Sequence, residues 1–346
     1  MTRSTYSHSV SPDRLLELID RFPRLRVAIF GDLIVDEFIY GEIARVSREA
    51  PVLILNYDST ELVPGGGGNA ASNVAALGAQ AVAVGAAGRD ETGSRLLEAM
   101  RGRIDVGAVV RPKDFRTPTK TRILAGGVHS AKQQVVRIDR APAGSLSDAE
   151  RRALASKLSA AARRCDALLV SDYGSGLVTP ALVDEARRRL KTSNGQRAPL
   201  LVDSRYGLLK FRGISTCTPN ESEVEQLFDV RIGENARVLE RAGRELLTRT
   251  RAEAVLVTRG SRGMALFERD APTVHIPIHG SDQIADVTGA GDTVIATMAL
   301  AQAAGATNLE AARLANYAGG LVVMKRGTAT VSADELRDAV RSDGRW

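Results

Sequence analysis

Cysteine is scarce in this chain: Cys165 and Cys217 are the only two among 346 residues. Both lie close to strand-like segments, so the sequence argues against a disulfide framework and favours a reducing compartment. The N-terminus, Met1 to Val10, is polar and lacks the apolar centre of a signal peptide. No segment reaches the roughly 18 unbroken apolar residues that span a bilayer. We therefore expect a cytoplasmic protein with no membrane partner.

Neither basic nor acidic residues are in large excess in this chain. The chain has 47 Lys and Arg against 41 Asp and Glu, a net charge of +6, which is mild for its length. A nucleic-acid-binding protein would show basic residues clustered with aromatic ones or a known motif, and neither occurs here. We expect no nucleic acid partner and interpret the local basic residues as contacts for an anionic substrate. At this length, the chain could form one large α/β domain or two ordinary ones.

Short β-branched runs alternate with amphipathic helical patterns along the chain. The predicted strands are 26–30, 81–86, 104–110, 167–171, 200–202, 214–218 and 254–258, the last followed by a small hairpin. The predicted helices are 12–22, 69–77, 91–101, 148–164, one that opens at Thr179-Pro180, one near 238–249, and two closing helices. Such alternation predicts an α/β fold with a mostly parallel sheet and helices on both faces. Two regions, Glu37 to Tyr57 and Thr117 to Asp139, predict strands without intervening helices.

The stretch Asp286-Val287-Thr288-Gly289-Ala290-Gly291-Asp292, followed by an apolar run to Ala304, predicts a phosphoryl-transfer centre. Gly289, Ala290 and Gly291 can present successive backbone N–H groups to an anion at the first turn of a helix. Asp292 would fall one residue into that helix and accept the proton of an attacking hydroxyl. The alternative is a glycine-rich turn whose aspartates only cap the helix.

This string resembles the C-terminal signature of the ribokinase-like (PfkB) carbohydrate kinases. The resemblance implies a ribokinase-like fold over residues 11–346, with ATP and Mg²⁺ as cofactors. It makes Asp292 the catalytic base and the amides of residues 289–291 the anion hole. It also makes the two helix-free regions, at about 37–57 and 117–139, a small projecting β-sheet that closes over the sugar as a lid and excludes water.

The sugar side of the site follows from the same resemblance. Asp36 stands after the first strand, where open α/β sheets place their ligands, and its two oxygens suit vicinal hydroxyls. The segment Pro64 to Asn69 resembles the N-terminal signature of the family, which implies that Gly66 passes close to the sugar and that Asn69 binds it. Two alternatives remain: Asp36 as a solvated loop acid, and the glycines as a turn before a helix capped by Asn69.

The nucleotide side is implied by three further segments. Asn220 and Glu223 resemble the N-x-x-E motif of the family, in which the glutamate acts on Mg²⁺ through water, although the same spacing is a helix-capping pattern. Segments 257–263 and 314–320 resemble the nucleotide-side turn and the helix near adenine, and they imply binding roles for Thr258, Gly260, Gly263 and Asn316. His275 and His279 suggest a metal, but on a proline-broken strand we interpret them as surface residues.

Segments spread from about Ala28 to Leu336 resemble one branch of the family, the D-glycero-β-D-manno-heptose 7-phosphate kinases of lipopolysaccharide-core biosynthesis, in the form without a nucleotidyltransferase domain. This implies phosphorylation of the anomeric hydroxyl, with Lys120, Arg122 and Asp172 binding the sugar phosphate. The chain departs from the branch at Arg48, where proline is usual, and at Gly67 and Gly68, where alanines are usual. It also has Gly174-Ser175-Gly176 where the branch has a lysine, and Asp203-Ser204-Arg205 where the branch has aspartate-proline-lysine. The alternatives are a kinase for another sugar or a nucleoside, and a catalytically silent sugar or nucleotide sensor.

The lid also predicts a homodimer. A small sheet is marginal alone, and its exposed edges and apolar face invite pairing with a second copy. The apolar residues are Phe38, Ile39, Tyr40, Val52, Leu53, Ile54 and Leu55. The rival explanation is that these residues pack against the main domain of their own chain.

Overall fold

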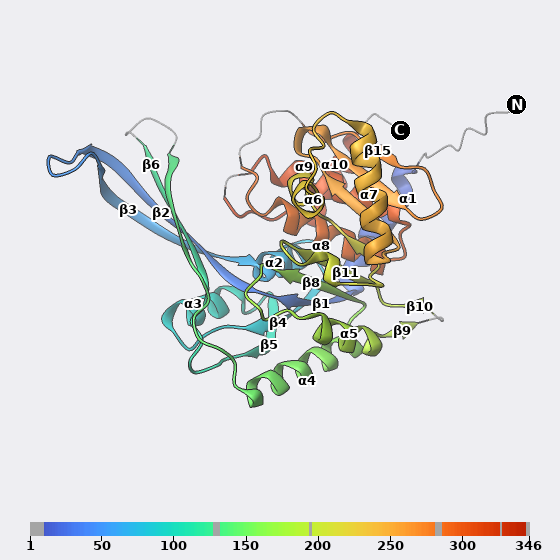
Figure 1. Ribbon diagram of the computed structural model, residues 1–346, viewed down its shortest axis with the longest axis horizontal. Coiled ribbons are helices and arrows are strands. Elements are labelled where there is room, and N and C mark those ends of the chain that lie inside the picture. The colour runs from blue at the N-terminus through green and yellow to red at the C-terminus, as the bar shows by residue number, and fades with distance from the viewer. Residues whose placement is uncertain (1–9, 127–131, 194–195, 281–285, 326, 344–346) are drawn as a thin grey trace, which may run out of the picture.

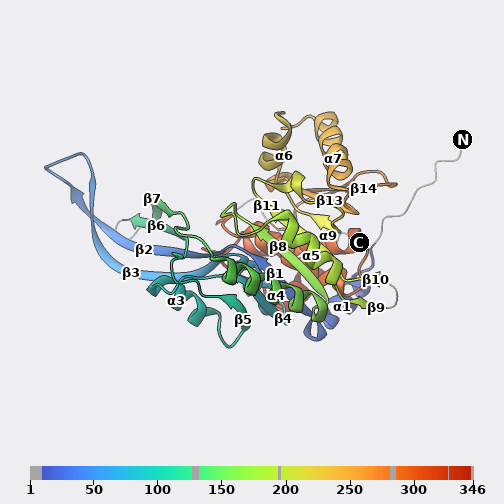
Figure 2. The ribbon, with the colours of Figure 1, turned by 60° about the horizontal axis from the view of Figure 1, so that its bottom comes forward.

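The computed structural model describes residues 10–126, 132–193, 196–280, 286–325 and 327–343. A main body of helices around one sheet carries a long, curved second sheet that projects from one end (Figure 1). Figure 2 shows the same projection from another side, with its far end away from the main body. The strand–helix alternation of the sequence therefore produces an α/β fold with a separate projecting sheet.

The main sheet has nine strands in the order β15-β14-β13-β12-β11-β8-β1-β4-β5. The strands are β1 (Arg26–Gly31), β4 (Gln80–Ala86), β5 (Ile104–Val110), β8 (Ala167–Asp172), β11 (Leu200–Ser204), β12 (Thr216–Cys217), β13 (Ala254–Thr258), β14 (Met264–Glu268) and β15 (Val274–Ile276). Neighbours from β13 to β5 are parallel, whereas β14 and β15 are antiparallel. All the parallel strands therefore end at one edge, where open sheets bind their ligands.

Helices cover both faces of this sheet, because successive residues of a buried strand face opposite sides. In β1, Val27 and Ile29 enter one hydrophobic core, and Ala28 and Phe30 enter the other. The first core is closed by α1 (Pro12–Arg21), α2 (Gly67–Ala76), α3 (Glu91–Met100), α8 (Ala290–Ala303), α9 (Asn308–Val322) and α10 (Ala333–Ser342). The second is closed by α4 (Asp148–Arg164), α5 (Pro180–Arg189), α6 (Glu221–Phe228) and α7 (Ala236–Thr250).

The projecting sheet, called the lid below, has four strands in the order β3-β2-β6-β7. They are β2 (Leu33–Val46), β3 (Leu53–Gly66), β6 (Thr119–Gly126) and β7 (Gln133–Arg140). Strands β2 and β6 are parallel, and the other pairs are antiparallel. The strands extend beyond the predicted range of 37–57 on both sides, because β2 follows β1 after the single residue Asp32 and β3 continues to Gly66.

Three local predictions were wrong. The chain closes with three helices, not two, since α10 opens at Ser332 with a capping box to Glu335. The strand expected over 214–218 is reduced to Thr216–Cys217. Helix α2 begins at Gly67, two residues before Asn69, because Gly66 takes a positive φ of 55° and ends the preceding strand there.

Other expectations from composition can be compared with the structure. Cys165 and Cys217 are both buried and free, as expected for a chain without a disulfide framework. None of the helices in the described ranges has the length and apolar character needed to cross a bilayer.

Candidate active site

One cavity of about 820 Å³ lies at the carboxyl ends of the parallel strands, between the root of the lid and the N-terminus of α8. It is the place that the topology favours for a ligand. The predicted site residues that line it are Asp36, Gly66, Lys120, Arg122, Asp172, Asn220, Glu223, Thr258, Gly260, Gly263, Gly289, Ala290, Gly291, Asp292 and Asn316. The remaining predicted residue, Asn69, contacts Asp292 through its side chain.

The N-terminus of α8 presents backbone amides to this cavity. Gly289 is the N-cap with a φ of 79°, a left-handed conformation that favours glycine. The Ala290 amide donates to the Val287 carbonyl at 3.3 Å, whereas the Gly289 and Gly291 amides have no backbone acceptor within the described ranges. These two N–H groups and the helix dipole suit an anion such as a phosphate.

Asp292 is the third residue of α8, not one residue inside it as the sequence suggested. Its side chain is buried and accepts hydrogen bonds from two donors. Asn69 Nδ2 donates to Oδ2 at 2.8 Å, and the Tyr173 hydroxyl donates to Oδ1 at 3.2 Å and lies 3.4 Å from Oδ2. Burial raises the pKa of Asp292 to about 7, while the bonds from Asn69 and Tyr173 act in the opposite direction. A carboxylate that titrates near neutrality is suited to act as a general base.

A buried chain of side chains fixes the orientation of Asn69. The Thr293 hydroxyl donates to Asn73 Oδ1 at 2.9 Å, and Asn73 Nδ2 donates to Asn69 Oδ1 at 3.2 Å. Because the Asn69 oxygen is thus occupied, its NH₂ group faces Asp292. Asn69 lies inside the first turn of α2 and is not its cap, so the capping alternative for this residue is wrong.

On the lid side, Asp36 and Arg122 form an ion pair with 2.6 Å between Nη1 and Oδ1. Both side chains are largely buried, and the Arg122 guanidinium also lies over the Phe38 ring. The neighbouring Gly65 has no space for a side chain, since a Cβ there would lie 2.4 Å from Asp36 Oδ2. Arg122 therefore acts on the carboxylate of Asp36, a partner that the sequence did not indicate.

Tyr173 is a site residue that the sequence-based prediction did not include. It follows β8, and its ring lies 4.5 Å from Lys120 Nζ and 5.8 Å from the Arg205 guanidinium. Neither cation lies within ion-pair distance of a carboxylate in the described part of the chain, although the charge of Asp36 acts on Lys120 and that of Arg205 acts on Glu223. Burial lowers the pKa of Lys120, so an anionic ligand beside it would favour its charged form. Asp172 faces the cavity, but its oxygens accept from Gly174 N at 3.0 Å and Ser204 Oγ at 2.6 Å.

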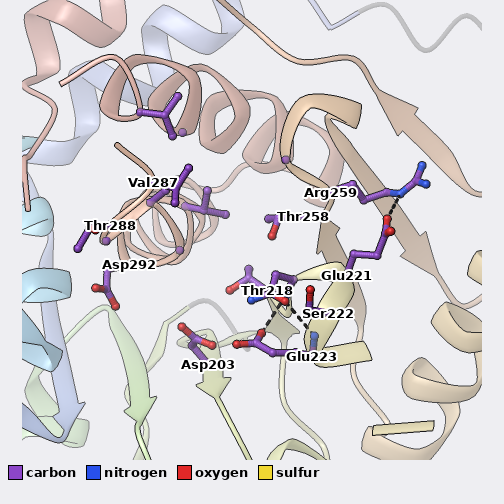
Figure 3. A pocket seen from close by; sticks show the side chains of 18 of the residues that line it. Asp203, Thr218, Glu221, Ser222, Glu223, Thr258, Arg259, Val287, Thr288 and Asp292 are labelled. Carbon is purple, nitrogen blue, oxygen red and sulfur yellow. Dashed lines mark hydrogen bonds and ion pairs between the residues drawn. The ribbon is translucent and has the colours of Figure 1, made fainter. Parts of the chain in front are cut away.

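A second missed residue, Asp203, stands at the end of β11. Figure 3 shows Asp203, Glu223 and Asp292 with their carboxyl groups directed into the same part of the cavity. Burial, followed by the charges of Glu223 and Asp292, raises the pKa of Asp203 well above its usual range. The end-of-strand position was the available signal, because the carboxyl ends of parallel strands meet at the ligand-binding edge.

The acidic pair Asp203 and Glu223 fits a hydrated Mg²⁺ ion. Burial raises the pKa of Glu223, and carboxylates that repel one another in a buried cavity are stabilised by a cation. No cluster of three His, Cys, Asp or Glu suited to direct metal ligation occurs among the described residues. Glu223 also completes the capping box of α6, since its Oε2 accepts from Asn220 N at 2.9 Å.

The far end of the cavity is formed by the turn after β13 and by α9. Gly263 has a φ of 73°, and a Cβ there would lie 2.1 Å from the Ile276 carbonyl oxygen. Asn316 Nδ2 donates to the Pro277 carbonyl at 2.9 Å, so its carboxamide also braces this region. Glu221 pairs with Arg259 at 2.7 Å and with Arg262 at 2.5 Å (Figure 3 shows the first pair).

The histidines of the β15 region do not form a metal site within the described residues. His275 is exposed, as expected. His279 is only partly exposed, because its ring packs edge-on against Tyr317 with 4.6 Å between centroids, and it lies 3.9 Å from Asp343. The expectation that both are surface residues was therefore wrong for His279.

Comparisons with known proteins agree with this geometry. The family model described as "pfkB family carbohydrate kinase" matches residues 26–335. The bifunctional protein HldE of Geobacter sulfurreducens is 37% identical over 314 residues, covering 90% of this chain and 62% of that protein. HldE of Caulobacter sp. is 39% identical over 328 residues, covering 94% of this chain and 64% of that protein. The chain thus spans less than two thirds of these relatives.

Solved structures share the fold at low sequence identity. Escherichia coli phosphofructokinase-2 in complex with potassium has a TM-score of 0.74 and 21% identity, over 92% of this chain and 98% of that one. Arabidopsis thaliana ribokinase complexed with ribose and ATP has a TM-score of 0.70 and 19% identity, over 92% and 99%. The fold is therefore ribokinase-like. With the match over residues 26–335 and the HldE relatives, this chain belongs to the pfkB family of carbohydrate kinases, which phosphorylate sugars with ATP and Mg²⁺.

Proposed function

We propose that this kinase phosphorylates the anomeric hydroxyl of D-glycero-D-manno-heptose 7-phosphate, a step towards ADP-heptose and the lipopolysaccharide core. The observation that carries the choice of a phosphorylated sugar is the pair of cations, Lys120 and Arg205, that flank Tyr173 without carboxylate partners in the described chain. A neutral sugar would gain little from the positive charges of Lys120 and Arg205, whereas a sugar phosphate would bind both. The HldE relatives support the heptose branch of the family.

In this proposal each part of the cavity has one task. Asp36 and Gly66 contact the sugar, and Arg122 orients Asp36. Asn69 holds the base, and Asp172 shapes the loop that carries Tyr173. Asn220, Thr258, Gly260, Gly263 and Asn316 surround the nucleotide, and Glu223 and Asp203 act on Mg²⁺ through water. The kinase domain spans residues 11–346, and the two free, buried cysteines support a cytoplasmic location.

In the proposed reaction, the sugar hydroxyl attacks the γ-phosphorus in line with the leaving ADP, between Asp292 and the anion hole. The sugar hydroxyl loses its proton to Asp292 as its oxygen bonds to the γ-phosphorus. The bond from that phosphorus to the β–γ bridging oxygen breaks, and ADP leaves with the electron pair. The free amides of Gly289 and Gly291 would stabilise the charge on the phosphoryl oxygens. Asp203 and Glu223 would hold Mg²⁺ through water, and the ion would supply positive charge to the phosphates of the nucleotide.

Substrate recognition can be tested by comparing Lys120→Met with Arg122→Ala. Charge-assisted bonds contribute ~1.5–3 kcal/mol, so Lys120→Met should raise the KM for heptose 7-phosphate by about 10-fold to 100-fold, and should leave the KM for the dephosphorylated heptose nearly unchanged. Arg122→Ala should raise both KM values alike, because Arg122 acts through Asp36. Equal effects of Lys120→Met on both sugars would remove Lys120 from phosphate recognition.

Two rival functions are tested by one assay. ATP turnover against a panel of sugars, sugar phosphates and nucleosides should be highest with heptose 7-phosphate. Faster turnover of another acceptor would assign this chain to a different branch of the family. No turnover with any acceptor, together with sugar or nucleotide binding, would favour a silent sensor, although the buried Asp292 and the open amides argue against one.

We propose further that two copies associate through their lids. Several apolar residues of the lid are exposed in the single chain: Ile43, Val46, Val52, Leu53, Tyr57, Val135, Val136 and Ile138. Phe38 is different, because it is buried within its own chain beside Arg122. The far part of the lid projects from the main body, which supports cover by a second copy over packing against the main domain of its own chain (Figure 2).

If two copies pair through their lids, the mass in solution should fall to that of one chain when the apolar surface of the lid is changed. Light scattering at micromolar concentration should give two chains for the wild type and one chain for Val46→Asp, because a charge would be placed on an apolar face that pairs Val46 with Leu53. Tyr206→Asp, an exposed position outside the lid, is the matched control and should remain dimeric. A wild-type mass of one chain, unchanged by substrate, would contradict the proposal.

A further inference from the structure

We propose that Tyr173 occupies the catalytic base in the sugar-free enzyme and has to be displaced by the acceptor hydroxyl, so that it selects a sugar over water. The inference rests on the proposed function, in which Asp292 is the base. It concerns the choice between two acceptors for the same phosphoryl group: the sugar, which yields product, and water, which yields only hydrolysis of ATP.

The two oxygens of Asp292 are in different situations. Oδ2 accepts from Asn69 Nδ2 at 2.8 Å and lies 3.4 Å from the Tyr173 hydroxyl. Oδ1 accepts only from Tyr173, at 3.2 Å, among the hydrogen bonds of the described residues. An attacking hydroxyl must reach one of these oxygens to transfer its proton. Oδ1 therefore becomes available when the Tyr173 hydroxyl moves away.

The two donors differ in how firmly they are held. Asn69 is buried and bound in the chain through Asn73 to Thr293, so it remains on Oδ2. Tyr173 lines the cavity, and no hydrogen bond among the described residues holds its hydroxyl apart from those to Asp292. Its backbone is anchored, since Tyr173 N donates to Asp32 Oδ2 at 2.8 Å. The movement required is thus confined to the side chain, and the loop keeps its place.

A phosphorylated sugar provides the means to move the ring. Lys120 and Arg205 lie over the Tyr173 ring at 4.5 Å and 5.8 Å, in cation–π contacts. A sugar phosphate binds both cations more strongly than the ring does. Because binding the phosphate takes the cations from the ring, the arriving substrate weakens the contacts that hold Tyr173 over the base.

Water is the competing acceptor when no sugar is bound. Its oxygen would bond to the γ-phosphorus as its proton passes to Asp292, the bond to the bridging oxygen would break, and ADP and inorganic phosphate would leave. While the Tyr173 hydroxyl donates to Oδ1, this oxygen cannot accept a proton from water. Water also has no phosphate group that could bind Lys120 and Arg205 and so weaken their contacts with the Tyr173 ring. The lid excludes water only after it closes, so the tyrosine protects ATP in the open state.

The first experiment measures ATP hydrolysis without sugar in Tyr173→Phe, at a pH above the acid limbs of both enzymes, where Asp292 is ionised in each. Loss of one hydrogen bond to the base should raise this rate by about threefold to tenfold. Tyr206→Phe is the matched control, because Tyr206 is exposed and lies outside the cavity, and it should leave hydrolysis unchanged. In Asp292→Asn both hydrolysis and sugar phosphorylation should be lost, which separates a failure of this inference from a failure of the proposed base.

The second experiment compares pH profiles in Tyr173→Phe, with sugar varied at saturating ATP. Groups that face Asp292 are Asp36 and Lys120 from the lid and Asp203 from β11, and the variant changes none of them. Removing the tyrosine donor raises the pKa of the free base, so the acid limb of kcat/KM should move to higher pH. The acid limb of kcat should stay in place, because the bound sugar has already displaced the tyrosine.

Two outcomes would overturn the inference. Unchanged ATP hydrolysis in folded Tyr173→Phe would show that the hydroxyl does not shield the base. Equal movement of the acid limbs of kcat and kcat/KM would show that Tyr173 stays on Asp292 throughout turnover and only positions it.

Discussion

Asp292→Asn should lower the turnover number by about 10²–10⁴-fold while the affinity for ATP stays nearly constant. Asparagine keeps the size of the side chain but cannot accept the proton of the sugar hydroxyl. The ATP contacts in the proposal come from the backbone amides and the far end of the cavity, which the substitution leaves in place. Steady-state kinetics with heptose 7-phosphate and equilibrium binding of ATP give the two quantities.

The other aspartate of the same motif is the matched control. Asp286 accepts from Thr288 N at 2.8 Å and from Gly327 N at 3.1 Å, so its carboxylate holds the loop before α8. Asp286→Asn should therefore reduce stability more than it reduces turnover. Near-normal turnover in Asp292→Asn would show that another group accepts the proton.

Gly289→Ala should reduce turnover by about 100-fold and destabilise the fold by ~1–3 kcal/mol. Gly289 has a φ of 79°, and its added Cβ would lie 2.5 Å from Asn69 Nδ2. The new methyl group would push Asn69 away from Asp292 and disturb the amides that face the phosphate. Thermal unfolding and steady-state kinetics on the same preparation measure the two effects.

Two further alanine variants separate the two effects of Gly289→Ala, which are the strain of a positive φ and the contact of the new Cβ with Asn69. Gly102 has a φ of 85° and open space where its Cβ would be, so Gly102→Ala introduces comparable strain far from the cavity and should preserve turnover. Gly291→Ala adds a methyl group to the cavity without strain, so it should lower turnover and leave stability nearly unchanged. Full activity in Gly289→Ala would contradict the role of this turn.

The parts of the fold with local signals could be predicted from the sequence. The capping box of Ser147 and Glu150 marked the start of α4, and Thr179-Pro180 marked that of α5. The three residues that form the turn before Asp292 are consecutive, so a short motif was enough to identify them. Helix α10 was missed although Ser332 and Glu335 carry the same capping signal, because its apolar positions are few.

The contacts that complete the site could not be predicted, because the fold alone brings their residues together. Tyr173 and Asp292 are 119 residues apart, and Arg122 and Asp36 are 86 apart. The chain Thr293–Asn73–Asn69 joins two helices that come from opposite ends of the sequence. Neither periodicity nor a motif indicates which polar side chains pair across such separations.

Asp32 is the single residue between β1 and β2, so it connects the lid directly to the main sheet. Its backbone amide donates to the Ser171 carbonyl in the main sheet at 3.0 Å, and its buried carboxylate holds the loop of Tyr173. Only this residue separates β1 from β2, so the first lid strand continues directly from an interior strand of the main sheet. The same residue therefore joins the lid to the main sheet and fixes the backbone of the loop that carries Tyr173, so the lid and the catalytic base share one anchor.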